Sequence, residues 1–211
     1  MLSNRRPFWS KNLKVDSMAV SKKAMRDAIV DAARYIFARF GYRKATIDSI
    51  ARAARKGKSS VYYYFKNKEE IFLAVIEKEA NAVKSEIKNA LASATDPREK
   101  LTIYVLTRMR VFHRIARFYS SFREEYLKEY DFIQRFRENY DRYETKLILD
   151  ILREGIKKNI FSIPDPALAA GYFVTALKGF EYLWGTEEDI DKLEKKTEAM
   201  LEMLYRGILK R

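Results

Sequence analysis

The sequence predicts an all-α protein. It has only seven glycines and four prolines in 211 residues, so few positions would interrupt a helix. Alternating apolar and polar residues bounded by turn signals, which are typical of strands, are scarce. Signals for helix starts recur at Ser21, Thr46, Asn67, Asp96, Asp165 and Thr186, where a capping side chain precedes a segment of helical periodicity. Together these three observations favour helices throughout the chain.

The helices can be placed in order from these signals. Ile29 and Phe37 belong to an apolar stripe on the first long helix, and Gly41 supplies its stop signal. Two short helices joined by the tight connection 55–57 then form a helix-turn-helix. Longer helices follow, and the pattern does not fix the boundary near residue 117. The predicted helices cover residues 22–40, 47–54, 58–65, 68–91, 97–117, 118–158, 166–184 and 187–209.

The composition excludes several kinds of chemistry. The chain has no cysteine, which rules out disulfides, thiolate metal sites and thiol nucleophiles. His113 is the only histidine, so the usual His-rich metal sites cannot be assembled within one chain. We therefore expect no metal, no cofactor and no catalytic residues. An enzyme built on helix-borne carboxylates such as Glu124, Glu125 or Glu129 ranks third among the alternatives, because it lacks a nucleophile or metal shell.

No segment has the features of a membrane span or an export signal. The longest uncharged run, residues 166–177, is far shorter than the roughly 20 residues needed to cross a bilayer. Residues 1–20 lack the apolar stretch of a secretory signal. The sequence therefore predicts a cytoplasmic protein with no membrane partner.

The net charge of +13 is confined to one end of the chain. Residues 1–68 contain 17 Lys or Arg and four Asp, whereas residues 69–211 contain 25 basic and 25 acidic residues. Such a one-sided excess is typical of a protein that holds a polyanion with one end. A solvated basic face or tail without a partner is the alternative interpretation.

The most specific pattern in the chain is Ile50–Phe72, IARAARKGKSSVYYYFKNKEEIF. It resembles the DNA-binding signature of the TetR family of bacterial transcriptional regulators. The match extends upstream through Ala32-Ala33, Ile36-Phe37, Phe40-Gly41-Tyr42 and Ala45-Thr46-Ile47. The resemblance implies a homodimeric repressor that grips operator DNA with its helix-turn-helix and releases the DNA when a small molecule binds.

The second short helix is the expected reading element. A helix of two turns is not stable alone, so one face, with Val61 and Phe65, should pack against the core. Small, polar and basic side chains at its start would enter the major groove. For Tyr64, DNA contact and helix packing are equally favoured roles. The resemblance implies backbone contacts from Thr46, Tyr62 and Lys68, and positions nearest the bases for Lys58, Ser59, Ser60 and Tyr63.

The turn between the two short helices departs from the family pattern. Arg55-Lys56-Gly57 stands where the family has glycine, an apolar residue and serine or threonine. We expect Arg55 to adopt a left-handed conformation, which costs about 1 kcal/mol without glycine. Gly57 would be only a fair N-cap. Phosphate attraction to the two extra cations could offset these costs.

Residues 1–20 form a basic arm that contains Phe8 and Trp9. No apolar period holds this segment to a core, so we expect it to be disordered. The alternative is an arm that binds in the minor groove, with Arg5, Arg6, Lys11 and Lys14 supplying charge.

Residues 97–160 are rich in large aromatic side chains, most of which must form core. The resemblance implies a bundle whose interior admits an effector, and apolar walls with a few polar groups are typical of small-molecule sites. We therefore expect a small apolar or aromatic effector. His113, with Arg110 and Arg117 nearby, could receive a carboxylate, although a structural histidine is favoured. The pocket candidates are Phe112, His113, Tyr119, Phe122, Tyr140 and Tyr172.

The last two predicted helices carry broad apolar faces. Packing within one chain would explain part of each face, and the resemblance implies that the remainder forms a four-helix interface between two copies. The predicted interface residues are Phe173, Leu177, Phe180, Trp184, Met200 and Leu204.

The sequence thus predicts three parts: the arm (1–20), a three-helix helix-turn-helix domain for DNA binding (21–68), and a larger helical bundle for effector binding and dimerisation (69–211). The expected partners are a roughly palindromic double-stranded operator, an effector and a second copy of the chain. A ligand-independent architectural or nucleoid-organising DNA-binding protein of the same fold is the alternative function.

Overall fold

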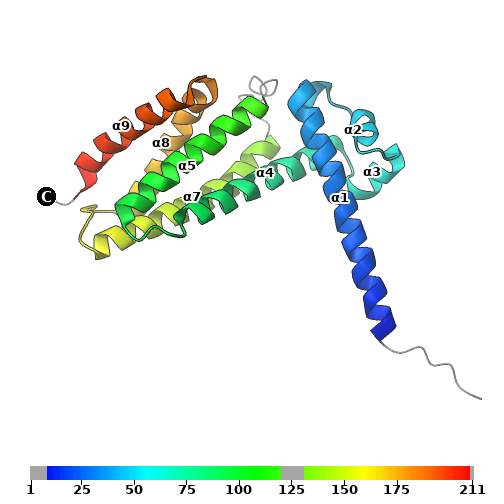
Figure 1. The fold of residues 1–211 in the computed structure, drawn as a ribbon, viewed down its shortest axis with the longest axis horizontal. Helices are drawn as coiled ribbons and strands as arrows, with labels where there is room; N and C mark the ends of the chain where they lie inside the picture. The colour runs from blue at the N-terminus through cyan, green and yellow to red at the C-terminus, as the bar shows by residue number, and fades with distance from the viewer. Residues whose placement is uncertain (1–8, 120–130, 210–211) are drawn as a thin grey trace, which may run out of the picture. The chain divides into compact units, whose positions relative to one another are not determined.

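The computed structural model describes the backbone of residues 9–119 and 131–209, and the side chains of 22–119 and 137–209. The all-α prediction is confirmed across these residues, where the one β feature is an isolated bridge between Phe161 and Leu209. The helices (Figure 1) are α1 (Trp9–Lys44), α2 (Ile47–Ala53), α3 (Lys58–Tyr64), α4 (Lys68–Leu91), α5 (Pro97–Phe118), α7 (Asp131–Lys157), α8 (Pro166–Thr186) and α9 (Ile190–Ile208).

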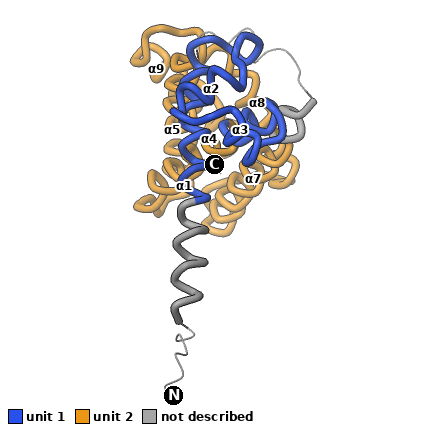
Figure 2. Tube along the Cα trace, turned by 90° about the vertical axis from the view of Figure 1, so that its right-hand side faces the viewer, with its two compact units in different colours: residues 1–75 blue, residues 76–211 orange. Residues whose placement is uncertain are grey.

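The chain divides into two compact units, residues 1–75 and 76–211 (Figure 2). The division falls inside α4. The start of this helix belongs to the first unit because Ile71, Phe72 and Val75 are buried there. Phe72 meets the ring of Phe37 from α1 edge to face, with centroids 5.1 Å apart. The aromatic contact ties α1 to α4 and so frames the two short helices between them.

α1 begins at Trp9, well before the predicted start at Lys22. The added residues contain neither glycine nor proline and include several good helix formers, so propensity favours continuation of the helix toward the N-terminus. The predicted stop at Gly41 is confirmed: this residue has φ 75° and ψ 166° and interrupts the helical backbone. A positive φ of this kind suits glycine, which has no side chain to clash with the backbone.

Local capping explains where the later helices begin. Asp96 accepts a hydrogen bond from the Glu99 N–H at 3.0 Å, and Asp165 caps α8 in the same way, as the sequence predicted. The start of α9 differs from the prediction. Asp189 is its N-cap, whereas the Thr186 hydroxyl donates back to the Tyr182 carbonyl and Thr186 ends α8. A carboxylate that accepts two backbone N–H groups is the better cap here.

The predicted segment 118–158 contains α7 and a stretch, 120–130, that lies outside the described residues. Gly155 sits inside α7, near its end. A Cβ atom at this position would lie 2.0 Å from the Phe161 ring, so the close approach of that ring requires glycine. Asn159 then adopts φ 61°, a left-handed conformation that asparagine tolerates well, and turns the chain toward α8.

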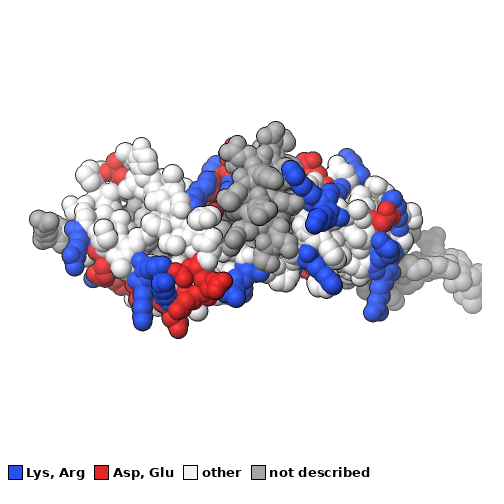
Figure 3. Space-filling model, turned by 90° about the horizontal axis from the view of Figure 1, so that it is seen from above, with Lys and Arg blue, Asp and Glu red and all other residues white. Residues whose placement is uncertain are grey.

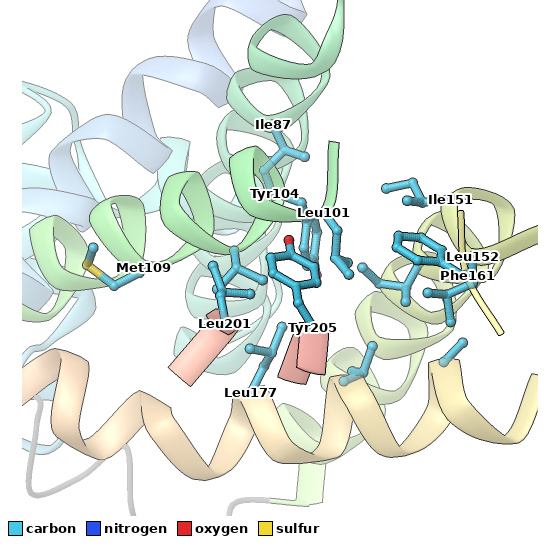
Figure 4. Packing of buried hydrophobic residues seen from close by; sticks show 14 of the residues in the cluster. Ile87, Leu101, Tyr104, Met109, Ile151, Leu152, Phe161, Leu177, Leu201 and Tyr205 are labelled. Atoms are coloured by element: carbon cyan, nitrogen blue, oxygen red, sulfur yellow. The ribbon is translucent and has the colours of Figure 1, made fainter. Parts of the chain in front are cut away.

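The core of the second unit lies between α5, α7, α8 and α9 (Figure 4). α5 contributes Leu101 and Tyr104, α7 contributes Ile151, and α8 and α9 contribute Leu177 and Tyr205, all nearly or fully buried. None of the described helices is long and apolar enough to span a membrane.

Charged side chains are distributed differently in the two units. In Figure 3, the second unit shows acidic and basic side chains lying next to each other, which agrees with its balanced composition. Several of these charges form ion pairs across helices, such as Arg114 with Glu86 at 2.7 Å and Lys100 with Glu154 at 2.6 Å. The excess positive charge therefore belongs to the first unit.

Candidate nucleic-acid interface

α2 and α3 pack against each other as the predicted helix-turn-helix. A reciprocal capping box fixes the start of α2: Thr46 Oγ1 accepts from the Ser49 N–H, and Ser49 Oγ accepts from the Thr46 N–H, each at 3.1 Å. Thr46 remains exposed at this helix start. The second short helix, α3, has Gly57 as its N-cap and no side-chain cap.

α3 has two distinct faces. Val61 is fully buried, and the adjoining C-cap residue Phe65 is nearly so; together they provide the packing that such a short helix requires. The opposite side presents Lys58 and Ser59 to solvent, and Tyr63 is 67% exposed. Tyr62 is also exposed, and Ser60 is half-buried. The polar and basic residues of the predicted reading surface therefore gather on one side of a helix anchored by its other side.

Tyr64 lies between these two faces. Its side chain is half-buried, and its ring meets that of Tyr63 edge to face with centroids 5.0 Å apart. Lys22 of α1 places its ammonium 5.8 Å from the Tyr63 ring centroid. Tyr64 thus supports an exposed neighbour, so packing is one part of its role in the free protein.

Lys58 is held by a carboxylate in the free protein. Its Nζ lies 2.9 Å from Asp48 Oδ2 in α2, and both side chains are more than half exposed. The hydrogen bond from Lys58 to Asp48 and the charge of that carboxylate raise the pKa of Lys58, so the residue stays cationic. An exposed pair of this kind is weak and exchanges readily for another anion.

The resemblance implies that Lys68 contacts the DNA backbone, but in the free chain its ammonium binds backbone carbonyl oxygens of the protein. Its ammonium donates to the carbonyl oxygens of Tyr42 at 2.7 Å, Ala45 at 3.0 Å and Arg43 at 3.4 Å. It also lies 4.4 Å from the Tyr42 ring centroid. Lys68 therefore ties the start of α4 to the connection between α1 and α2.

The turn between α2 and α3 contains the expected strain. Arg55 has φ 54°, which confirms the predicted left-handed conformation, and the Lys56 N–H donates to the Ala51 carbonyl at 2.9 Å. The exposed Arg55 and Lys56 side chains leave the turn toward solvent. The chain therefore keeps a cation at a backbone position that glycine would occupy without strain.

Replacement of Arg55 by glycine should raise the unfolding free energy by about 1 kcal/mol relative to Arg55→Ala, because alanine keeps the strained φ and both variants lose the same charge. Chemical denaturation of the two variants measures the difference. Equal stabilities would show that the turn carries no strain.

The pocket candidates of the second unit lie in different environments. Phe112 and Tyr140 are half-buried, and the Phe112 ring lies 6.4 Å from that of Trp184. His113 is buried with Nε2 2.9 Å from the Glu187 carbonyl oxygen, and Tyr119 donates to Glu79 at 2.8 Å. Tyr172 is 68% exposed, so it does not line the interior of this bundle, and Phe122 lies outside the described residues.

The basic side chains near His113 are also engaged. Arg110 pairs with Glu194 of α9, and Arg117 donates to the Glu188 carbonyl at 3.1 Å. With His113, they fasten α5 to the connection between α8 and α9 and to the start of α9. These three groups thus form structural contacts in the free chain.

The predicted interface residues occupy two different places. Leu177 and Trp184 are buried in the core of their own chain, and Trp184 is only 1% exposed. Phe173, Phe180, Met200 and Leu204 are half-buried at the edge of that core. The large apolar side chains that the two helices expose are others, none of them among the predicted interface residues: Leu168, Tyr172 and Tyr182 of α8, and Met203 of α9.

The bundle also contains a buried charge cluster that no sequence pattern predicted. Arg108 of α5 lies between Glu144 of α7 and Glu181 of α8, and Tyr104 donates to Glu144 at 2.6 Å. Burial opposes the charge of Arg108, but the acidic groups around it, Glu144 foremost and then Tyr104 and Glu181, together outweigh this effect and the pKa of Arg108 is raised. The pKa of Tyr104 is raised by burial and by the same carboxylate, so Tyr104 stays a donor.

Two short helices with one buried side and one basic, polar side define a helix-turn-helix DNA-binding domain. Comparison with known proteins gives the family. Residues 29–75 match the family described as bacterial regulatory proteins, tetR family. An uncharacterised HTH-type transcriptional regulator of Bacillus subtilis strain 168, YhgD, is 26% identical over 190 residues, which cover 89% of this chain and 96% of that protein.

Two further proteins are similar over most of the chain. The HTH-type transcriptional repressor KstR2 of Mycolicibacterium smegmatis is 29% identical over 145 residues, 66% of this chain and 68% of that protein. The crystal structure of a transcriptional regulator from Cytophaga hutchinsonii ATCC 33406 has a TM-score of 0.72 at 28% identity, covering 87% of this chain and 98% of that one. The helix-turn-helix of this chain is therefore a TetR-family DNA-binding domain, and the chain is similar to HTH-type transcriptional regulators over most of its length.

Proposed function

We propose that this chain is a repressor that binds a roughly palindromic operator as a homodimer and is released by a small apolar or aromatic effector. The observation that carries the proposal is the solvent-facing start of α3, with Lys58, Ser59 and Tyr63 exposed opposite the buried Val61. Its similarity to the repressor KstR2 supports the direction of regulation.

We assign the residues of the interface as follows. Lys58, Ser59, Ser60 and Tyr63 approach base edges in the major groove, where hydroxyls and an ammonium can meet several base types. Thr46 and Tyr62 contact phosphates, and such contacts fix the register of the protein on the duplex. Lys68 acts in part by holding the segment before α2, since its ammonium already binds three carbonyl oxygens. Tyr64 supports Tyr63.

The proposed dimer uses the exposed faces of α8 and α9. Leu168, Tyr172 and Tyr182 are all more than half exposed on α8. At 3.6 residues per turn, Leu168 lies between the two tyrosines, about 40° from each, so the three side chains share one side of the helix. Met203 of α9 is 76% exposed. A Cβ atom added at Gly179 would meet only open space, so this face of α8 leaves room for close approach by another helix. We infer that the dimer interface lies on the exposed side of α8 and not on its buried side, which contains Leu177 and Trp184.

Tyr182→Glu should weaken the dimer by at least about a hundredfold, because it would bury an unpaired carboxylate in each half of a two-fold interface. Tyr182 is 65% exposed in the single chain, so the substitution leaves the core intact. Tyr35→Glu is the matched control, since it changes an exposed tyrosine of α1 in the same way. Sedimentation velocity over a range of concentrations compares the two; identical association by both variants would overturn this interface.

A two-fold dimer explains how an effector could release DNA. Two recognition helices must lie about 34–36 Å apart to enter successive major grooves. An effector that binds better to a conformation with a different spacing weakens DNA binding by that difference in affinity. The same coupling requires operator DNA to weaken effector binding by an equal factor.

A reporter gene placed behind the operator tests the direction of regulation. Expression should fall when the wild-type chain is produced and recover with Tyr63→Ala, which removes an exposed side chain without touching the buried Val61. A rise in expression with the wild-type chain would identify an activator. No response from a reporter whose operator the protein binds in vitro would argue against transcriptional control at that site.

A further inference from the structure

The charge cluster of the bundle has one unsatisfied group. Arg108 Nε donates to Glu144 Oε1 at 2.8 Å, and Arg108 Nη2 donates to Glu144 Oε2 at 3.2 Å and to Glu181 Oε1 at 2.9 Å. Arg137 binds the other oxygen of Glu181 at 2.6 Å. Among the described side chains, Arg108 Nη1 is the buried nitrogen for which the structure offers no hydrogen-bond partner.

An unsatisfied donor is unusual for so buried a group. The Arg108 side chain is 6% exposed and Glu144 is fully buried, so water does not reach the guanidinium freely. Buried N–H donors are nearly always paired, because loss of hydration without a new acceptor costs free energy. Trp184 lies against the guanidinium, with the central carbon 5.4 Å from the ring centroid. An aromatic face compensates a donor less well than an oxygen atom does.

We propose that Arg108 Nη1 is the polar anchor of the effector site and takes a neutral oxygen acceptor, such as a ketone or amide carbonyl, carried on an aromatic or apolar body. This proposal rests on the proposed effector release and specifies the chemical class of the effector. The surrounding rings match an apolar body: Trp184 faces the guanidinium, and Phe112 and Phe180 each lie within 6.4 Å of Trp184, centroid to centroid.

The charges of the cluster disfavour an anionic effector. Among the residues that the structure describes, the positive charges of Arg108 and Arg137 in these ion pairs equal the negative charges of Glu144 and Glu181. A carboxylate at Nη1 would add a third negative charge in a region from which water is largely excluded, and a buried charge without its own counter-ion is costly. A carbonyl oxygen supplies the missing acceptor and changes no charge.

Three fluorescent probes with one dimethylaminonaphthalene body test the proposal on the full chain. The first carries an ethyl ketone, the second a carboxylate, and the third carries no acceptor. The ketone should bind about tenfold more tightly than the body without an acceptor, as expected for one hydrogen bond to a charged donor. It should also bind more tightly than the carboxylate, and its emission should report a hydrogen-bonded carbonyl in an apolar environment.

Two matched variants locate the anchor. Arg108→Lys keeps the positive charge between the two glutamates but removes Nη1, so it should abolish most of the tenfold preference for the ketone. Arg137→Lys makes the same change at the other arginine of the cluster and should preserve that preference. Thermal unfolding establishes that each variant is folded, and the comparison of the three probes on the wild-type chain needs no variant at all.

Each outcome bears on a separate claim. Equal affinity for the ketone and the body without an acceptor, tighter binding of the carboxylate, or equal effects of the two arginine variants would overturn the anchor. Operator affinity measured in the same samples tests the regulator separately. Operator binding with no ketone preference would leave the DNA-binding function standing and the anchor refuted, whereas a ketone preference with no change in operator affinity would refute only effector release.

Discussion

Glu144→Ala is expected to lower the unfolding free energy by about 3–5 kcal/mol, because it leaves the Arg108 guanidinium buried without its principal counter-ion. The substitution also removes the acceptor of the Tyr104 hydroxyl, which lies 2.6 Å from Glu144 Oε1. Denaturant unfolding monitored by circular dichroism measures the loss. This is the largest effect on stability that we expect from any single charged residue described in the bundle.

Glu154→Ala is the matched control for this prediction. Glu154 lies on the same helix and pairs with Lys100 and Lys158 at 2.6 and 2.8 Å, but its side chain is partly exposed. Loss of such a pair should cost no more than about 1 kcal/mol, because solvent screens the remaining charges. Equal losses in the two variants would mean that the burial of the Arg108 cluster has no special energetic consequence.

Substitutions at the start of α3 should have the largest effects on DNA binding. Lys58→Ala and Tyr63→Ala should each weaken operator binding by about 1–3 kcal/mol, roughly fivefold to more than a hundredfold, since both side chains are exposed on the proposed reading surface. Tyr62→Phe should cause a smaller loss, because it removes only a hydroxyl. Fluorescence anisotropy with labelled operator provides the affinities.

Lys58 should also contribute electrostatic attraction to DNA of any sequence, and the salt dependence of binding distinguishes this contribution from base contacts. It must exchange Asp48 for DNA, so Asp48→Asn should strengthen binding to duplexes of any sequence, most clearly at low salt. Lys157→Ala is the control for loss of a cation, because this exposed lysine lies at the end of α7 in the second unit. If Lys157→Ala weakened operator binding as much as Lys58→Ala, the assignment of the interface would be wrong.

The sequence predicts those features of the fold that depend on neighbouring residues. The caps at Thr46, Asp96 and Asp165 act over three residues, so a local pattern contains all the information they need. The stop at Gly41 and the strained turn at Arg55 are local for the same reason. The division of α3 into buried and exposed faces likewise follows from helical periodicity.

Features that depend on distant residues could not be predicted. Arg108, Glu144 and Glu181 come from three helices, and no local pattern shows that their charges will be buried together. α8 carries apolar residues on two stripes, and only the packed chain shows that Leu177 is buried while Tyr182 is exposed. The carbonyl oxygens that surround the Lys68 ammonium lie 23 or more positions earlier in the chain.

Selection of bound sequences from random duplex DNA, followed by titration of the best site against salt, tests the central claim most directly. We expect a roughly palindromic sequence bound by a dimer, with an affinity that falls steeply as salt rises because several phosphates are contacted. Salt-sensitive binding with no preferred sequence would contradict this account and would favour an architectural DNA-binding protein of the same fold.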